Sequence, residues 1–319
     1  MSCPFACNNL QCGWFKFVAS LGFYGLRPEF QACHMAPGGS IKRGSAMGIF
    51  FCFGSPKSGT TLLQRALNLH PRISCPSEHD FRALYEGFKS LFGQYNNVLM
   101  QADRRTGGQG ATVVGGESID SVFRDCVLTL IKTAAGSKSI MGANDNSIIA
   151  NLDFFNALFS QPRMIAIFRN PVDQGLSAWH HNLRLAQEEN DPRHSQLMTQ
   201  FGGLDGWLRY YATMFNQNAD RWSQFASRHD NAYMVRYEDL VARRKAVLRA
   251  LFTFLGADAD DATLDPIVTE TDIDRMRATS PNPRFFRAGA TDMGSREVTK
   301  RLRREIAGMT ADAMKRLGY

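Results

Sequence analysis

The sequence has 319 residues, of which 44% are hydrophobic, and a formal net charge of +7 with a pI of about 9.1. That length accommodates one large α/β domain or two small ones, and the positive charge suits an anionic ligand. The chain shows no zinc-finger spacing and no aromatic-basic RNA-binding module, so we expect no nucleic-acid partner. No apolar run approaches the ~20 residues of a transmembrane helix. The seven cysteines are an odd number without a Cys-x-x-Cys pair, which argues against a secreted disulfide framework and favours a cytoplasmic protein.

Residues 1–46 show no clean helical or strand period and contain much Gly, Pro and Cys. We expect this stretch to be an N-terminal extension without a catalytic role, either disordered or translated from a start upstream of the true one. Met35 and Met47 are later candidate starts. Neither a linker nor an internal repeat divides the remainder, so residues 47–319 are predicted to form one domain.

From residue 49 onward, short apolar runs alternate with amphipathic patterns, which indicates strands alternating with helices. Strands are predicted at residues 49–53, 72–76, 139–142, 164–168 and 233–236. Helices are predicted after residue 61 and at residues 119–134, 152–159, 171–179, 204–225, 247–255 and 297–317, with a Gly-rich loop at 104–114. We therefore predict an α/β fold, a single three-layer, P-loop-type domain with a central parallel sheet of about five strands flanked by helices.

The first predicted strand leads into a Gly-rich turn that opens a helix. This stretch reads Gly54-Ser55-Pro56-Lys57-Ser58-Gly59-Thr60-Thr61. Such a turn points free backbone N–H groups and the positive end of a helix dipole at one place, where a phosphate can bind. The ATP-binding loop G-x-x-x-x-G-K-[ST] has the same glycine spacing, but here Thr60 follows the second glycine and Lys57 stands inside the loop.

A second motif, Arg169-Asn170-Pro171, follows the buried strand at 164–168, with Ser177 eight residues after the arginine. Because ligands of open α/β sheets bind at the carboxyl edge of the strands, we expect Arg169 on the same edge as the first loop. An arginine there offers two donors to a phosphate, and Ser177 offers a third.

The first motif resembles the 5′-phosphosulfate loop of the sulfotransferases that use 3′-phosphoadenosine 5′-phosphosulfate (PAPS), and the resemblance extends from about Ile49 to Tyr319. It implies that PAPS is the co-substrate, that adenosine 3′,5′-bisphosphate is the product, and that the loop holds the phosphosulfate. The residues concerned are Ser55, Pro56, Lys57, Ser58, Gly59, Thr60 and Thr61. Lys57 is then the group that stabilises the leaving phosphate.

The same resemblance assigns the 3′-phosphate to Arg169 and Ser177. The stretch Phe285 to Met293 resembles the C-terminal Arg-x-Gly loop of the family, so Arg287 and Gly289 are also expected to bind the 3′-phosphate. Tyr237, at the end of the last predicted strand, is expected near the adenine or in a purely structural role. Leu62 stands where cytosolic members place the tryptophan that stacks on adenine, and this departure leaves the adenine partner unnamed.

Glu78 is the candidate catalytic base. The order His70-Pro71, short strand, Glu78 resembles that of the protein-tyrosine and heparan-type sulfotransferases. His79 and Asp145 are alternatives, since the histidine that cytosolic members carry at the end of the third strand is missing here. The Lys-x-Pro of many bacterial relatives is missing there as well.

Two other functions stay open, an ATP- and Mg²⁺-dependent phosphotransferase and a non-catalytic nucleotide-binding protein. Arg169 stands where a metal-binding acidic residue would end its strand, so we expect no metal requirement. The sequence does not name the acceptor, which could be a sugar, lipid, phenol or peptide. Residues 85–115 and 180–205 are expected to shape its pocket.

Overall fold

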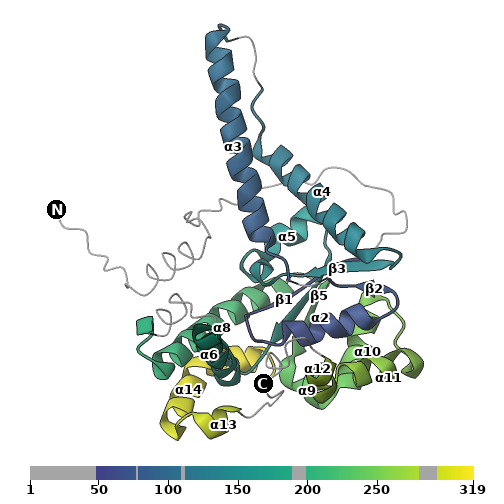
Figure 1. Ribbon diagram of the computed structural model, residues 1–319, viewed down its shortest axis with the longest axis vertical. Helices are drawn as coiled ribbons and strands as arrows, with labels where there is room; N and C mark the ends of the chain where they lie inside the picture. The colour runs from purple at the N-terminus through teal and green to yellow at the C-terminus, as the bar shows by residue number, and fades with distance from the viewer. Residues whose placement is uncertain (1–47, 77, 109–111, 189–198, 280–292) are drawn as a thin grey trace, which may run out of the picture. The chain divides into compact units, whose positions relative to one another are not determined.

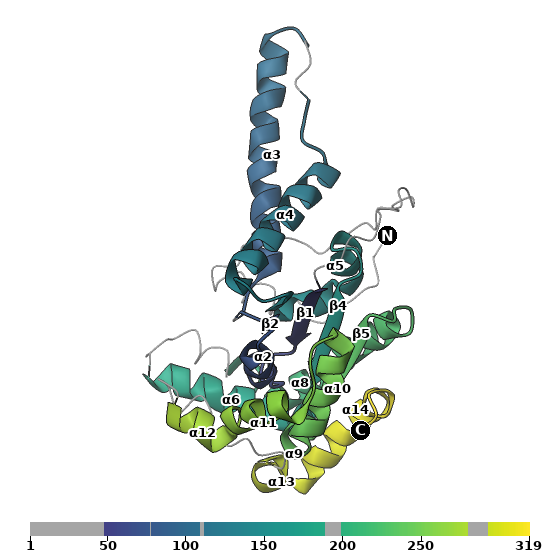
Figure 2. The same ribbon diagram turned by 90° about the vertical axis from the view of Figure 1, so that its right-hand side faces the viewer.

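The computed structural model describes residues 48–76, 78–108, 112–188, 199–279 and 293–319. The extension predicted over residues 1–46 lies outside this part of the chain. The described residues contain a central sheet with helices on both faces (Figures 1 and 2). The strands are β1 (Gly48–Gly54), β2 (Ile73–Ser74), β3 (Ile140–Asn144), β4 (Arg163–Phe168) and β5 (Ala232–Arg236).

All strand pairs are parallel and the order across the sheet is β2-β3-β1-β4-β5. The predicted α/β fold with five parallel strands is therefore confirmed. The chain moves from β1 to one side of the sheet for β2 and β3, then returns to the other side for β4 and β5. A crevice forms outside the carboxyl ends of the strands at such a reversal, so the loops after β1 and β4 are placed to share a ligand.

The helices that follow the strands cover the two faces of the sheet. Their bounds are α2 (Thr60–Leu69), α3 (Phe81–Arg105), α4 (Gly116–Ala135), α5 (Leu152–Leu158), α6 (Pro171–Glu188), α8 (Leu204–Ala226), α9 (Tyr237–Ala242), α10 (Arg244–Leu255), α11 (Asp261–Glu270), α12 (Ile273–Thr279), α13 (Met293–Glu297) and α14 (Lys300–Arg316), with a 3₁₀ turn η1 (Asn146–Ala150). Alternate residues of β1 enter two separate cores. Phe51 and Phe53 pack with α4, α5 and α8, whereas Phe50 and Cys52 pack with α2 and α10.

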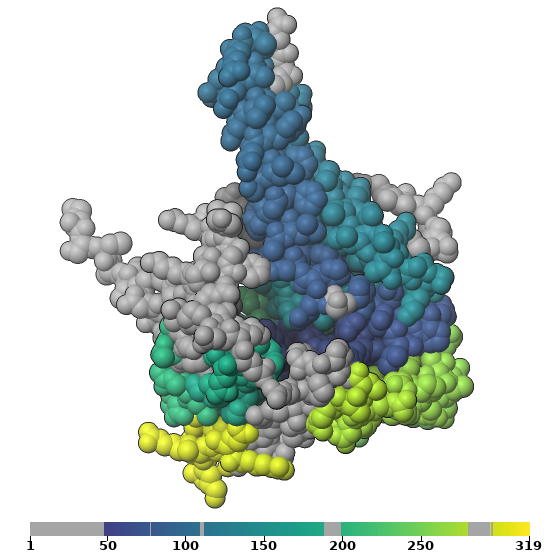
Figure 3. All heavy atoms as spheres, in the orientation of Figure 1, coloured from purple at the N-terminus to yellow at the C-terminus, as the bar shows by residue number. Residues whose placement is uncertain are grey.

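The helix α3 was not predicted from the sequence. It begins at the Asp80 cap, whose carboxylate accepts from the N–H of Ala83 at 2.9 Å, and it runs away from the sheet in both ribbon views and in the space-filling view (Figures 1, 2 and 3). Because α3 continues to Arg105, the predicted loop at 104–114 starts too early. The outer part of α3 exposes Leu91, Tyr95 and Val98.

Two other predicted helices differ in detail. The helix α4 begins three residues before its predicted start, and it buries Phe123, Val127 and Ile131 while Val122 and Leu130 are exposed. The predicted last helix at 297–317 is two helices, because Thr299 caps a new helix, α14, with its hydroxyl accepting from the N–H of Leu302. Neither difference changes the edge of the sheet that carries the candidate site.

Candidate active site

The loop between β1 and α2 has the strand–turn–helix form that the sequence predicts. The N–H of Ser58 donates to the carbonyl of Ser55 at 3.0 Å, which closes a tight turn around Lys57. Lys57 and Gly59 both adopt positive φ angles, of 67° and 103°. The helix α2 begins at Thr60 without a side-chain cap, so its first backbone N–H groups are available to a ligand.

Glycine is required at two positions of this loop. A Cβ on Gly54 would overlap the hydroxyl of Ser58, and a Cβ on Gly59 would overlap the ring of Tyr237. Gly59 also has a φ that other residues rarely adopt. The glycine spacing therefore has two steric causes, which are the close approach of Ser58 to Gly54 and of Tyr237 to Gly59.

The back of the loop is anchored by two helices. The amide of Asn218 on α8 donates to the hydroxyl of Ser55 at 2.8 Å, and the amide of Gln174 on α6 donates to the carbonyl of Pro56 at 2.8 Å. Ser55 and Ser58 are buried, and the hydroxyl of Ser58 has no hydrogen-bond partner in the described structure. Such a loop is preorganised, because the backbone is fixed before a ligand arrives.

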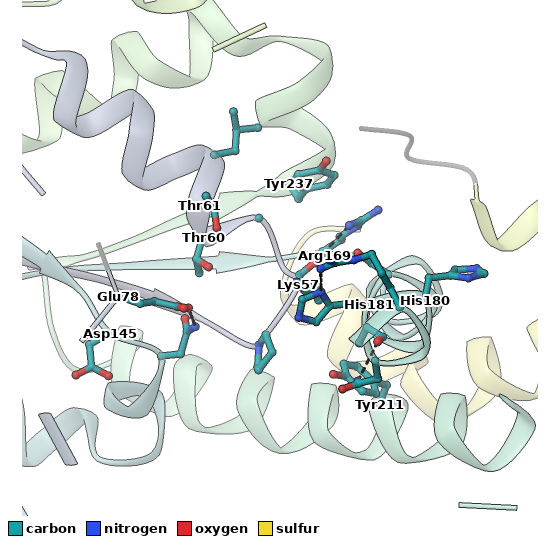
Figure 4. Close-up of a pocket in the computed structure, with 18 of the residues that line it drawn as sticks. Lys57, Thr60, Thr61, Glu78, Asp145, Arg169, His180, His181, Tyr211 and Tyr237 are labelled. Atoms are coloured by element: carbon teal, nitrogen blue, oxygen red, sulfur yellow. Dashed lines mark hydrogen bonds between the residues drawn. The ribbon is translucent and has the colours of Figure 1, made fainter. Parts of the chain in front are cut away.

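Arg169 follows β4 and lies against this loop. Its guanidinium donates to the carbonyl of Lys57 at 3.3 Å and stacks on the ring of Tyr237, with 4.4 Å between Cζ and the ring centre. Figure 4 shows the side chains of Lys57 and Arg169 beside each other. The structure thus brings together the two motifs that the sequence predicts at one edge.

Lys57, Arg169 and Ser177 line a cavity of about 1010 Å³. Its wall includes the predicted residues Pro56, Gly59, Thr60, Thr61, Glu78 and Tyr237. Burial lowers the pKa of Lys57 to about 8, the charge of Glu78 opposes this shift, and the charge of Arg184 adds to it. At neutral pH the ammonium group of Lys57 is therefore mostly charged and partly stripped of water, the state in which it attracts an anion most strongly.

Glu78 reaches the cavity from the segment after β2. Its Oε1 accepts a hydrogen bond from the amide of Asn146 at 2.5 Å, and the same amide's Oδ1 accepts from the N–H of Gly54 at 3.1 Å. Asn146 therefore links the end of β1 to Glu78. This role of Asn146 was not predicted from the sequence.

The two alternative bases, Asp145 and His79, also line the cavity, and both make contacts that support the local structure. Asp145 is fully buried and accepts from the N–H groups of Phe81 at 2.6 Å and Ser147 at 2.7 Å. Burial raises its pKa to about 6, against the effect of these hydrogen bonds. His79 stacks on the ring of Phe81 at 4.8 Å, and burial lowers its pKa. Glu78, which is exposed to the cavity, remains the candidate that a substrate can reach most directly.

An apolar group of side chains lines the cavity beyond Tyr237. It consists of Leu62 on α2 and of Ile273 and Met276 on α12. The spacing of Ile273 and Met276, one helical turn apart, places them on one face of α12. Neither residue was predicted to line the site, because nothing in the sequence links α12 to the first loop.

The face of α6 beyond Ser177 continues the cavity wall with His180, His181, Arg184 and Gln187. The spacing of three and four residues could have predicted this face. The guanidinium of Arg184 contacts Nδ1 of His181 at 3.1 Å, and Nε2 of His180 contacts the carboxylate of Glu297 at 2.5 Å.

Some expected site residues lie elsewhere or outside the described chain. The residues that line the cavity include 180–184 and Gln187 but none of the described residues within 85–115, so the expectation for 85–115 is not supported. Arg287 and Gly289 lie outside the described residues. In the part of the chain that the structure describes, no cluster of His, Cys, Asp or Glu could hold a metal, and no helix is long and apolar enough to cross a membrane.

A family model described as "Sulfotransferase family" matches residues 50–261, which include both motifs that the sequence predicts to bind anions. The chain belongs to the sulfotransferase family. This sulfotransferase is 23% identical over 218 residues to protein-tyrosine sulfotransferase 1 of Danio rerio, a match that covers 68% of this chain and 56% of that protein. The chain thus spans just over half the length of that relative.

Two further proteins are similar to this chain, one over a shorter stretch of sequence and one in its fold. The sulfotransferase is 27% identical over 126 residues to nodulation protein NoeE of Sinorhizobium fredii (strain NBRC 101917 / NGR234), covering 39% of this chain and 29% of that protein. Its fold is similar to that of the mouse sulfotransferase SULT7A1, solved in complex with PAP, with a TM-score of 0.51, 15% identity and coverage of 85% and 86% of the two chains.

Proposed function

We propose that this sulfotransferase transfers the sulfo group of PAPS to a hydroxyl or amine of an acceptor. The observation that carries the proposal is the contact between Arg169 and the carbonyl of Lys57 at 3.3 Å. It places the two anion-binding motifs side by side, as a nucleotide with phosphate at both its 3′ and 5′ positions requires. Membership of the sulfotransferase family supports the same reaction class.

The residues present fit such a nucleotide. The hydroxyl of Ser58 is buried and has no partner among the described residues, and the glycine positions leave the backbone of the loop open to a phosphosulfate. Arg169 and Ser177 are placed to hold the 3′-phosphate, and we propose that Arg287 and Gly289 complete that site. The apolar side chains of Leu62, Ile273 and Met276 are placed to hold adenine, in the role that the missing tryptophan has in cytosolic members.

In the proposed reaction the acceptor oxygen or nitrogen forms a bond to sulfur while the bond from sulfur to the 5′-phosphate oxygen breaks. Glu78 takes the proton of the acceptor. Lys57 stabilises the negative charge that grows on the leaving phosphate, and adenosine 3′,5′-bisphosphate departs. These residues supply positive charge without a metal ion, so we propose that the transfer needs none.

The direct test is incubation of the purified chain with ³⁵S-labelled PAPS and EDTA, with a peptide tyrosine, a sugar, a lipid alcohol and a simple phenol as separate acceptors. Label transferred to an acceptor supports the proposal and names the acceptor class. Transfer of ³²P from ATP that depends on added Mg²⁺, with no transfer of ³⁵S from PAPS, would instead show a phosphotransferase. Tight binding of adenosine 3′,5′-bisphosphate without transfer to any acceptor would favour a non-catalytic nucleotide-binding protein.

A further inference from the structure

Glu238 forms a bridge between two distant parts of the chain. It lies in the first turn of α9, directly after Tyr237. Its Oε1 accepts from the backbone N–H of Asn170 at 2.8 Å, and its Oε2 accepts from the hydroxyl of Tyr319 at 3.0 Å. One carboxylate therefore holds both the segment after β4 and the last residue of the sequence.

Arg169 and Tyr237, which are next in sequence to the two ends of this bridge, line the proposed nucleotide site. Asn170 follows Arg169, and Glu238 follows Tyr237, while the guanidinium of Arg169 stacks on the ring of Tyr237 at 4.4 Å. The bridge therefore joins the backbones on either side of the stacked pair. Loss of the bridge would let Arg169 move relative to Tyr237 without removing either side chain.

Tyr319 is itself held in place. The guanidinium of Arg236 lies 5.5 Å from its ring centre and donates to the carbonyl of Gly318, and the ring of Phe215 packs edge-on at 6.4 Å. Burial, and then the nearby charge of Glu238, raise the pKa of Tyr319 well above its usual value. Its hydroxyl thus keeps its proton and donates to Glu238 over the whole physiological pH range.

We propose that Tyr319 is a positioning residue for the 3′-phosphate site, acting through Glu238 and Asn170 on Arg169. The proposal rests on the proposed function, because it takes Arg169 to be a ligand of the 3′-phosphate. In this proposal the segment that follows α14 supplies one hydroxyl group to a carboxylate more than 80 positions earlier in the chain. Tyr319 touches no nucleotide atom in this scheme.

The test compares two nucleotides that differ in the 3′-phosphate. Tyr319→Phe removes one hydrogen bond to a charged group, so the Kd for adenosine 3′,5′-bisphosphate should rise about 10-fold, measured by isothermal titration calorimetry. The Kd for AMP, which lacks the 3′-phosphate, should change by less than about 2-fold. The KM for PAPS should rise in step with the first Kd, while kcat at saturating PAPS stays near that of the unaltered chain.

Arg316→Gln is the matched control. It breaks the ion pair between Arg316 on α14 and Asp220 on α8, so it loosens the packing of α14 without touching the bridge. Glu238→Gln provides a second variant in case Tyr319→Phe is unstable, and it should also weaken binding of adenosine 3′,5′-bisphosphate. The double variant should lose little more than Glu238→Gln alone, because both changes act on one path.

Three outcomes would overturn the proposal. One is an unchanged affinity for adenosine 3′,5′-bisphosphate in Tyr319→Phe or in Glu238→Gln. Another is a loss of affinity in Arg316→Gln as large as that in Tyr319→Phe. The third is a loss of affinity of Tyr319→Phe for AMP as large as that for adenosine 3′,5′-bisphosphate. Both of these results would indicate a general loosening of the domain. Failure of the unaltered chain to bind adenosine 3′,5′-bisphosphate would instead refute the proposed function, so the two failures can be told apart.

Discussion

The guanidinium of Arg169 donates a hydrogen bond to the backbone carbonyl of Lys57, although 112 positions separate the two residues in the sequence. The contact forms because β1 and β4 are adjacent parallel strands, with Gly54 opposite Ile167, so the loops that follow them leave the sheet at one edge. The proposed nucleotide site depends on this pairing. Had β4 lain on the far side of β2, the two cationic groups would be separated by the width of the sheet.

Replacing Arg169 tests the 3′-phosphate role. Arg169→Ala should raise the Kd for adenosine 3′,5′-bisphosphate about 10- to 100-fold, because a hydrogen bond to a charged group contributes about 1.5–3 kcal/mol. The Kd for AMP should change much less. Arg169→Lys should recover only part of the affinity, since an ammonium lacks the two-pronged geometry of a guanidinium. Equal losses for both nucleotides would assign Arg169 a structural role.

Replacing Gly59 tests the steric reason for the loop. Gly59→Ala should destabilise the fold by about 2 kcal/mol or more, because strain at its positive φ adds to the overlap with Tyr237. Gly136→Ala is the matched control. Gly136 also has a positive φ, of 57°, but a Cβ there meets no neighbouring atom. Thermal unfolding should show a larger loss of stability in Gly59→Ala than in Gly136→Ala. Equal losses of stability would show that the overlap with Tyr237 contributes nothing to the effect.

Glu78→Gln tests the base. The amide keeps an oxygen that can accept from Asn146, so the local geometry should survive. We expect kcat to fall about 100-fold or more, in the range typical of lost general-base catalysis, while the Kd for adenosine 3′,5′-bisphosphate stays within about 2-fold. Asp80→Asn is the control, because Asp80 also lines the cavity and an asparagine can still cap α3. Full turnover in Glu78→Gln would exclude Glu78 from the mechanism.

The pH dependence tests the charge of Lys57. Because the pKa of Lys57 is lowered to about 8, its positive charge is present below that pH and is lost as the pH rises through it. The value of kcat/KM for PAPS, which reports the free enzyme, should therefore fall above about pH 8. Arg184→Gln removes a neighbouring positive charge that lowers this pKa, so the falling limb should move to higher pH. If the falling limb of the pH profile does not move in Arg184→Gln, a group other than Lys57 titrates there.

Local sequence patterns sufficed for much of the fold and part of the site. The apolar run at 164–168 indicated a buried strand, and the apolar run, glycines and helical pattern around Lys57 indicated a strand–turn–helix. The helix α3 escaped prediction because its Gly87, Gly93 and two adjacent asparagines lower helix propensity, and its stability depends on the Asp80 cap and on packing of its first turns. Helix propensity alone does not predict those tertiary contacts.

The sequence by itself determined which residues could bind an anion and on which edge of the sheet they would lie, because alternation of strands and helices fixes the direction of every loop. Only the tertiary structure decided which side chains meet there. Asp145 accepts hydrogen bonds from backbone N–H groups, Asn146 links Glu78 to β1, and Ile273 and Met276 join Leu62 from a helix more than 200 residues later. These contacts depend on strand order and on distances through space, which no local pattern of residues encodes.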